Sequence, residues 1–194
     1  MWKVGVLGAV ALLLVAGSSV ASTVIELDAQ QMVARSQAIV IGEVITMSSR
    51  NDGRYIVTDV TIRLDRAALK GNLLAGKTMT LTELGGELDG LVMRVAGAPA
   101  YRIGEQVAVF AAGRPDGSFR TLGLQQGKFR IQEAEVVREL AADSDAAQEG
   151  LAMAEAEATL DRTDSAARFP ERMPLADFVS RVESLVRNEK EVRR

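Results

Sequence analysis

The chain contains no cysteine and no histidine. Without cysteine it has no disulfide, no thiol nucleophile, no thiolate ligand for zinc or an iron–sulfur cluster, and no thiol for a lipid anchor. Without histidine it lacks the side chain that most often acts as a general base near neutral pH and most often ligates transition metals. No nucleophile–base spacing and no phosphate-binding loop is present. We therefore expect no cofactor, no bound metal and no enzyme activity.

Aromatic residues and positive charge are also scarce. Aromatic side chains make up 4% of the sequence, and 23 lysines and arginines stand against 26 aspartates and glutamates, for a formal net charge of −3. A nucleic-acid-binding protein usually presents a basic surface to the phosphates and, for single strands, aromatic rings to the bases. This composition therefore argues against nucleic acid as a partner.

The N-terminus has the features of a secretory signal peptide in their usual order. Lys3 precedes an apolar run from Val4 to Ala16, and small residues follow as far as Ala21. We expect cleavage after Ala21, which removes residues 1–21 and leaves a secreted or periplasmic protein. The alternative is an uncleaved anchor, but the apolar run is shorter than the roughly 20 residues of a spanning helix. We therefore expect no stable membrane anchor after cleavage.

Alternating aliphatic and polar residues predict a mainly β protein. Within Tyr55 to Gly71, Val60, Ile62 and Leu64 alternate with polar residues, as in a strand that turns one face to a core. Turn signals separate further expected strands, at 38–47, 77–84, 91–96, 106–111 and 118–124. The run 106–111 is more uniformly apolar, with Gln106 as its one polar residue, and should be covered on both faces. Residues 128–132 and 135–140 form a last hairpin, or a helix begins near Ala134. Such turn-delimited strands favour a closed antiparallel barrel.

Two helices flank the expected barrel of residues 22–140. The first spans Leu27 to Ser36, because Asp28 can cap it and Gln31 completes the spacing of a capping box. The second is an amphipathic helix that begins at Pro174 and continues into a charged tail, so that it covers 174–194. Between the barrel and the second helix, residues 141–173 are rich in alanine and acidic residues, which indicates a linker or a solvated helix.

Several of these runs resemble known domains. Residues 36–44, SQAIVIGEV, and the run TDVTIRLDRAALKG resemble the opening strands of netrin-like and tissue-inhibitor-of-metalloproteinase-like domains. The runs GGELDG, VAGAPAYRIGEQVAVF and GLQQGKFRI are similar to those of small exported bacterial proteins of unassigned function. The resemblance covers residues 36–132 and implies an OB-like Greek-key antiparallel β-barrel with the terminal helices packed against it. Inhibitors of this class present an N-terminal cysteine to a protease zinc, and that mechanism is excluded here.

Acidic residues offer two candidate sites. Three acidic residues lie close together in sequence around a glycine-rich turn; they are Glu83, Glu87 and Asp89. They form either a solvated turn or a site for a hard cation. Calcium needs six to eight oxygen ligands in a spaced array, which favours the solvated turn. Glu105 is isolated in sequence, and we expect it to pair with a surface arginine.

Two groups of residues are candidate contacts for a partner. The first group interrupts an apolar strand between two glycines and marks either a bulge or a contact; it comprises Gln125, Gln126 and Lys128. The second group forms the apolar stripe of the C-terminal helix, which packs on the chain's own barrel or on another protein; it comprises Leu175, Phe178, Val179, Val182 and Leu185.

The sequence therefore predicts an exported, non-catalytic binding or accessory module that acts through protein–protein contacts, by an exposed strand edge or its C-terminal helix. The partner would be another exported protein, such as a protease; the pattern does not define its identity or the number of copies of this chain in the assembly. Two alternatives remain open, a small-ligand carrier with an apolar barrel interior and a hydrolase that uses carboxylates.

Overall fold

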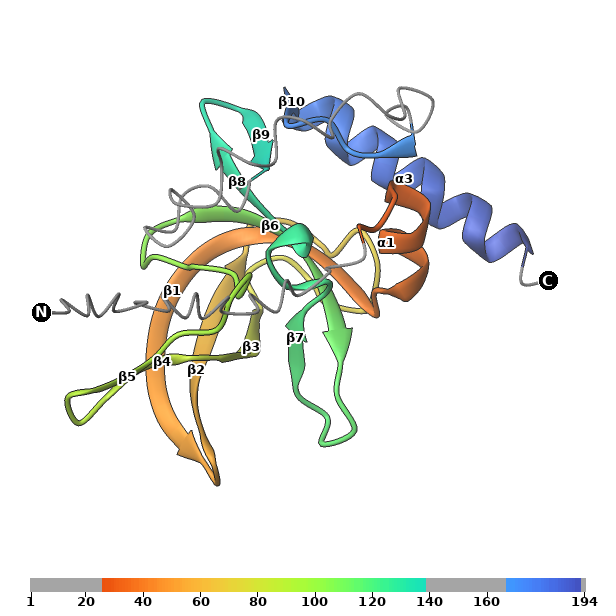
Figure 1. The fold of residues 1–194 in the computed structure, drawn as a ribbon. Helices are drawn as coiled ribbons and strands as arrows, with labels where there is room; N and C mark the ends of the chain where they lie inside the picture. Colours follow the sequence, from red (N-terminus) through yellow and green to blue (C-terminus); the bar gives the residue numbers. More distant parts are fainter. Residues whose placement is uncertain (1–25, 139–166, 193–194) are drawn as a thin grey trace, which may run out of the picture.

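The computed structural model describes residues 26–138 and 167–192 (Figure 1). The expected signal peptide and most of the expected linker therefore lie outside the described residues. The helices are α1 (Ala29–Arg35) and α3 (Leu175–Val192), with one 3-10 turn, η1 (Leu124–Gly127). The strands are β1 (Ala38–Asp52), β2 (Tyr55–Leu64), β3 (Thr78–Leu84), β4 (Gly86–Leu88), β5 (Leu91–Met93), β6 (Gln106–Gly113), β7 (Phe119–Thr121), β8 (Lys128–Gln132), β9 (Glu135–Arg138) and β10 (Arg172–Pro174).

In the described part of the chain, five strands close into a barrel. The strands β1, β2, β3, β7 and β6 follow one another around it, and β6 returns to pair with β1. The neighbours are antiparallel except β3 and β7, which run parallel. The first three strands are adjacent in chain order and the last two are exchanged, which is the arrangement of an OB-like Greek-key barrel. The predicted fold class is confirmed, together with its short N-terminal helix and its C-terminal helix.

The strand β1 is long and curved because it pairs with two different strands. Its first residues pair with β6 and its later residues with β2, and the pairing with β2 shifts register between Val44 and Thr46. Gly42 lies where these pairings overlap, and a side chain there would collide with the backbone carbonyl of Arg63. Glycine is thus required at this position by the close approach of the two strands.

Two layers of core lie on opposite sides of β1 and β6. On one side of the sheet, Val40 and Val109 belong to the cluster that fills the barrel. On the other side, Ile39 and Phe110 belong to the cluster that includes residues of α1 and α3. The prediction that residues 106–111 are covered on both faces is therefore confirmed. These two strands hold the barrel and the helical layer together.

Four of the five phenylalanines form the centre of the helical layer. Their ring centroids lie between 5.1 and 6.1 Å apart, a spacing typical of packed aromatic pairs. They come from β6, β8, the segment before β10, and α3; they are Phe110, Phe129, Phe169 and Phe178. The cluster explains how a chain with few aromatic residues fixes α3 against its barrel.

The apolar stripe of α3 faces the protein's own core. Phe178 and Val182 are fully buried, so a partner protein cannot contact them in this structure. Half-buried side chains complete the packing; they are Leu175, Val179 and Leu185. Of the two interpretations of this stripe, packing on the chain's own barrel is correct. The predicted partner contact is thereby corrected for Phe178 and Val182 and stays a prediction for the three half-buried residues.

Local sequence signals predict some ends of helices and strands correctly and others incorrectly. The Asp28 side chain accepts a hydrogen bond from the Gln31 backbone and Gln31 returns one, which confirms the predicted capping box of α1. The hairpin predicted after η1 is confirmed as β8 and β9. The strand predicted at 118–124 ends at Thr121, because the chain adopts positive φ at Gly123 and Leu124 and turns into η1. The edge strand β10 is absent from the elements predicted from the sequence.

No described helix is long and apolar enough to span a membrane.

Candidate functional site

The side chain of Lys128 is buried inside the fold. It follows η1 directly and pairs with Val109 in the adjacent strand, which directs it to the barrel side of β8. Its Nζ lies 2.9 Å from Glu105 Oε1, donates to the carbonyl of Ala100 and sits 4.9 Å from the centre of the Tyr101 ring. The partner contact predicted for Lys128 is therefore corrected: the ammonium group holds the segment before β6 against the barrel.

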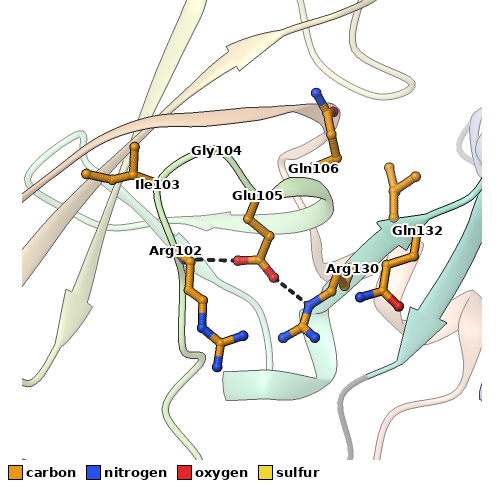
Figure 2. A pocket seen from close by; sticks show the side chains of 8 residues that line it. Arg102, Ile103, Gly104, Glu105, Gln106, Arg130 and Gln132 are labelled. Carbon is orange, nitrogen blue, oxygen red and sulfur yellow. Dashed lines mark hydrogen bonds and ion pairs between the residues drawn. The ribbon is translucent and has the colours of Figure 1, made fainter.

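Glu105 is the acceptor at the centre of this cluster. Its carboxylate also lies 2.9 Å from Arg130 Nε and accepts the backbone N–H of Arg102 at 3.0 Å (Figure 2). The predicted pairing with an arginine is present, but Glu105 is buried rather than on the surface. Because cations and a backbone donor surround its oxygens, this carboxylate anchors the segment before β6.

A shallow depression of about 380 Å³ lies beside this cluster. Figure 2 shows Arg102 and Ile103 on one side and Arg130 on the other, with Glu105 between them. The remaining lining residues are Gly104, Gln106, Ile131 and Gln132. Arginine is enriched at protein interfaces, and this depression has two arginines in its lining.

The two glutamines of the predicted contact lie in the turn η1 and are half-buried. Gln126 Oε1 accepts the backbone N–H of Leu27 at 2.8 Å, and the backbone N–H of Gln125 donates to the Gly97 carbonyl at 2.9 Å. The turn is thus not a strand bulge, and the partner contact of these half-buried glutamines stays a prediction. The turn joins the start of α1 to the segment before β6.

Glu83 lies inside the barrel, and the predicted solvated turn is wrong for this residue. Its Oε1 accepts the Thr121 backbone N–H at 2.7 Å and the Thr121 hydroxyl at 2.6 Å. Burial raises the pKa of Glu83, against the opposing effect of these hydrogen bonds and of nearby Arg120 and Arg114. Glu87 and Asp89, the other members of the predicted acidic group, are exposed as expected. Within residues 26–138 and 167–192 no group of acidic side chains could hold a metal ion.

Glu83 borders a second cavity, of about 180 Å³, at the junction of β3 and β7. Two arginines, Arg114 and Arg120, contribute to its lining. The other lining residues are Thr82, Leu84, Ala98, Pro99, Thr121, Gly123 and Leu124. This cavity combines a buried carboxyl group, two cationic side chains and an apolar wall, which is the usual make-up of a small-ligand site.

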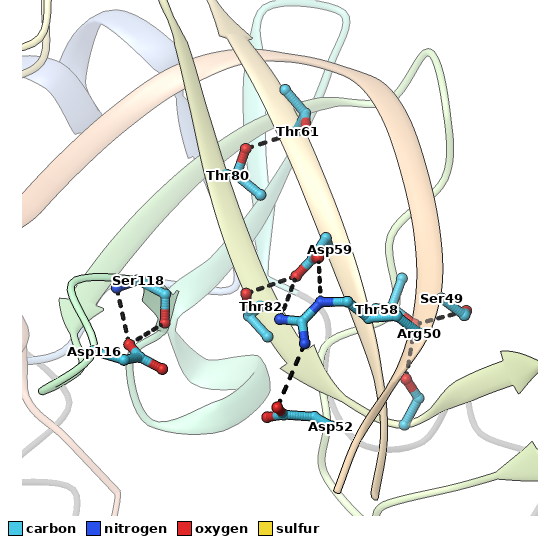
Figure 3. Close-up of polar contacts among 11 residues, drawn as sticks. Ser49, Arg50, Asp52, Thr58, Asp59, Thr61, Thr80, Thr82, Asp116 and Ser118 are labelled. Carbon is cyan, nitrogen blue, oxygen red and sulfur yellow. Dashed lines mark hydrogen bonds and ion pairs between the residues drawn. The ribbon is translucent and has the colours of Figure 1, made fainter.

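The outer face of β1, β2 and β3 carries polar groups that pair with one another (Figure 3). Arg50 Nε lies 2.7 Å from Asp59 Oδ2, and the Thr82 hydroxyl donates to Asp59 Oδ1 at 2.7 Å. Burial acts to raise the pKa of Asp59, but the hydrogen bonds from Arg50 and Thr82 outweigh it and lower the pKa. Because its charged groups are already matched, this face offers little for a charged ligand.

The hairpin of β4 and β5 projects from the barrel (Figure 1) and carries two neighbouring exposed apolar side chains. Leu91 is 69% exposed and Val92 57% exposed. Tyr55 at the start of β2 and Leu84 at the end of β3 are also exposed, next to the hairpin. Among the described strands β5 pairs with β4 alone, so its other edge has no strand partner there.

No protein-family model, no curated protein and no solved structure matches the chain. The fold defines its class as an OB-like barrel with a helical layer on one side. What the protein does is therefore inferred from its own geometry.

Proposed function

We propose that the chain is an exported binding or accessory module that acts by contact with another protein, without catalysis. One observation carries the proposal: within residues 26–138 and 167–192 the outer edge of β5 has no strand partner, and the strand bears the exposed side chains of Leu91 and Val92. An extended segment of a partner can add to such an edge, with backbone hydrogen bonds for affinity and alternate side chains for specificity.

Exposed apolar strand edges are uncommon in soluble proteins because they invite aggregation. Natural edges are usually short, charged, covered by a helix or interrupted by proline. The strand β5 is short, but Leu91 and Val92 replace the charged residues that would protect it. Exposed apolar patches beside polar surface frequently mark interaction sites. A partner that covers β5 would remove this liability.

The interior of the barrel gives less support to a ligand carrier. Its lumen is filled by aliphatic side chains with almost no exposed area, which include Val40, Ile62, Leu81, Val107 and Val109. A carrier with an apolar interior needs a cavity of roughly 300–1,000 Å³ for a drug-sized ligand. A tightly filled barrel is better suited to serve as a rigid scaffold for a contact at its surface.

Export rests on the N-terminal sequence, and the resemblance to netrin-like domains stays a proposal. The charge at Lys3, the apolar run and the small residues up to Ala21 support cleavage and release into a secreted or periplasmic location. An OB-like barrel is compatible with the resemblance. N-terminal sequencing of the exported protein should start at Ser22, and an intact Met1 would contradict export by cleavage.

A capture experiment tests the partner contact. The exported protein is immobilised and exposed to envelope extract or culture fluid, beside a double variant Leu91→Lys/Val92→Lys that places charges on the β5 edge. The control is Leu74→Lys, because Leu74 is an equally exposed leucine, at 65%, outside the hairpin. We expect wild type and control to retain the same protein and the double variant to lose it. Equal capture by all three, or no capture, would contradict the proposal.

A further inference from the structure

The two parallel strands of the barrel meet at a single pair of residues. Leu81 of β3 pairs with Phe119 of β7, and the ladder does not extend beyond them. Two residues further along, Glu83 Oε1 takes the backbone N–H of Thr121. A side chain thus occupies the place where a strand-to-strand hydrogen bond would form. The strands stay apart there, and the cavity of about 180 Å³ lies at this junction.

The cationic groups at this cavity have little counter-charge within the described residues. Arg114 Nε lies 4.0 Å from Asp116 Oδ2, the outer limit of a salt bridge, and the other Asp116 oxygen already accepts both the backbone N–H and the hydroxyl of Ser118 (Figure 3). No described carboxylate forms a salt bridge with Arg120, which is exposed at the rim. Two arginines therefore line a space where, among the described lining residues, Glu83 alone carries a carboxyl group.

The size and the walls of the cavity further restrict the class of ligand that it can bind. Its volume is below the roughly 300–1,000 Å³ of drug-sized pockets, so it admits a small molecule. Leu84, Ala98, Pro99 and Leu124 form an apolar wall. An inorganic anion would leave this wall without contacts, whereas an organic anion could cover it. Guanidinium groups bind the planar carboxylate with two parallel hydrogen bonds.

We propose that the β3–β7 junction is a binding site for a small organic carboxylate with a short apolar body. The carboxylate lies between Arg114 and Arg120, and the apolar body contacts Leu84 and Leu124. Thr82 and Thr121 also border the cavity, but their hydroxyl groups already donate to Asp59 and Glu83, so the two arginines supply the polar contacts of the ligand. The lining of this cavity includes neither Leu91 nor Val92, although Leu84 lies between the cavity and the β4–β5 hairpin.

A titration followed by NMR tests the site. The probe is butyrate, added to the purified isotope-labelled protein, with inorganic phosphate and chloride as comparison anions at equal ionic strength. We expect saturable shifts of the amide signals of Leu84, Thr121 and Leu124 with butyrate alone. Arg120→Gln and Arg114→Gln should each weaken binding by roughly tenfold or more, because each removes a hydrogen bond to a charged group.

The matched control is Arg66→Gln, since Arg66 is an exposed arginine that pairs with Glu183 on α3. This variant should bind butyrate like the wild type. Unsaturable shifts, an equal response to chloride, or equal affinities of the Arg120 and Arg66 variants would overturn the site. Tighter binding of phosphate than of butyrate would overturn the carboxylate class. The double variant Leu91→Lys/Val92→Lys should keep butyrate binding, which separates this result from the capture experiment.

Discussion

The hydroxyl oxygen of Tyr101 lies 2.6 Å from Oγ1 of Thr121 inside the barrel. Thr121 has one hydroxyl hydrogen and donates it to Glu83, so Tyr101 must be the donor in this pair. The ring of Tyr101 also lies below the ammonium group of Lys128, which pairs with Glu105. Through Tyr101, the buried carboxyl groups of Glu83 and Glu105 thus belong to one continuous set of polar contacts.

Replacement of Tyr101 by phenylalanine tests the value of that single hydrogen bond. Thr121 keeps its bond to Glu83, so the variant loses one donor while the ring stays in the core. We expect the free energy of unfolding to fall by about 1 kcal/mol, the usual contribution of one buried hydrogen bond. Urea denaturation measures it. An unchanged midpoint would show that the pair contributes nothing to stability.

Stability should depend on pH through Glu83. Burial raises the pKa of the Glu83 carboxyl group above the ordinary value of 4.5, although Arg114 and Arg120 act to lower it. The folded state therefore holds the carboxyl proton of Glu83 more tightly than the unfolded state does. Stability linked to Glu83 is therefore present below pH 4.5 and is lost as pH rises through the higher pKa of the folded state.

Glu83→Gln should remove this part of the pH dependence, because glutamine keeps an oxygen acceptor for Thr121 and carries no charge. The measurement is the free energy of unfolding across a pH series, with Glu87→Gln as the exposed control. If the Glu83 and Glu87 variants gave the same pH profile, the buried carboxyl group would have no such role.

Lys128 and Glu105 should behave as a coupled pair. Lys128→Met removes the buried ammonium partner of Glu105 and leaves Arg130 as the remaining cation, so we expect a loss of stability below the roughly 3–5 kcal/mol typical of a buried charge left without any partner. Adding Glu105→Gln removes the carboxylate charge that Lys128 had matched, so the double variant should lose less stability than the two single variants summed. Denaturant unfolding of all four proteins measures the coupling energy. Strictly additive losses would refute it.

The phenylalanine cluster predicts that α3 belongs to the folding unit. Phe178→Ala opens a cavity among the three remaining aromatic rings and should lower the free energy of unfolding by about 3–5 kcal/mol. Val192→Ala, at the exposed end of the same helix, should change it by less than about 0.5 kcal/mol. Thermal unfolding compares the two. A small effect of Phe178→Ala would mean that α3 packs only weakly on the barrel.

Much of the fold is visible in the sequence because its signals are local. Alternation around Val60 and Ile62 identifies a half-buried strand, and the apolar run from Gln106 identifies a strand covered on both faces. Turn residues separate these strands, and the Asp28 capping box marks the start of α1. Such patterns depend on neighbouring residues only, so they can be recognised without a structure.

The sites are less visible because they depend on distant partners. Lys128 lies between a glycine and a phenylalanine, and only its pairing with Val109 shows that it points into the barrel. Gln126 accepts a hydrogen bond from Leu27, which lies 99 positions earlier in the sequence. For Glu83, the alternation of Met79 and Leu81 could have been extended by one step, which would have placed its carboxyl group inside.

The closing of the barrel between β1 and β6 has a consequence for how the chain folds. These strands pair residue by residue from Ala38 with Ala111 to Glu43 with Gln106, although β2 to β5 lie between them in sequence. Contacts across such long separations slow folding, because the intervening chain must be ordered first. During synthesis the apolar start of β1 has no β6 to pair with until β6 has left the ribosome. In that interval the nascent chain is most exposed to aggregation and most in need of a chaperone.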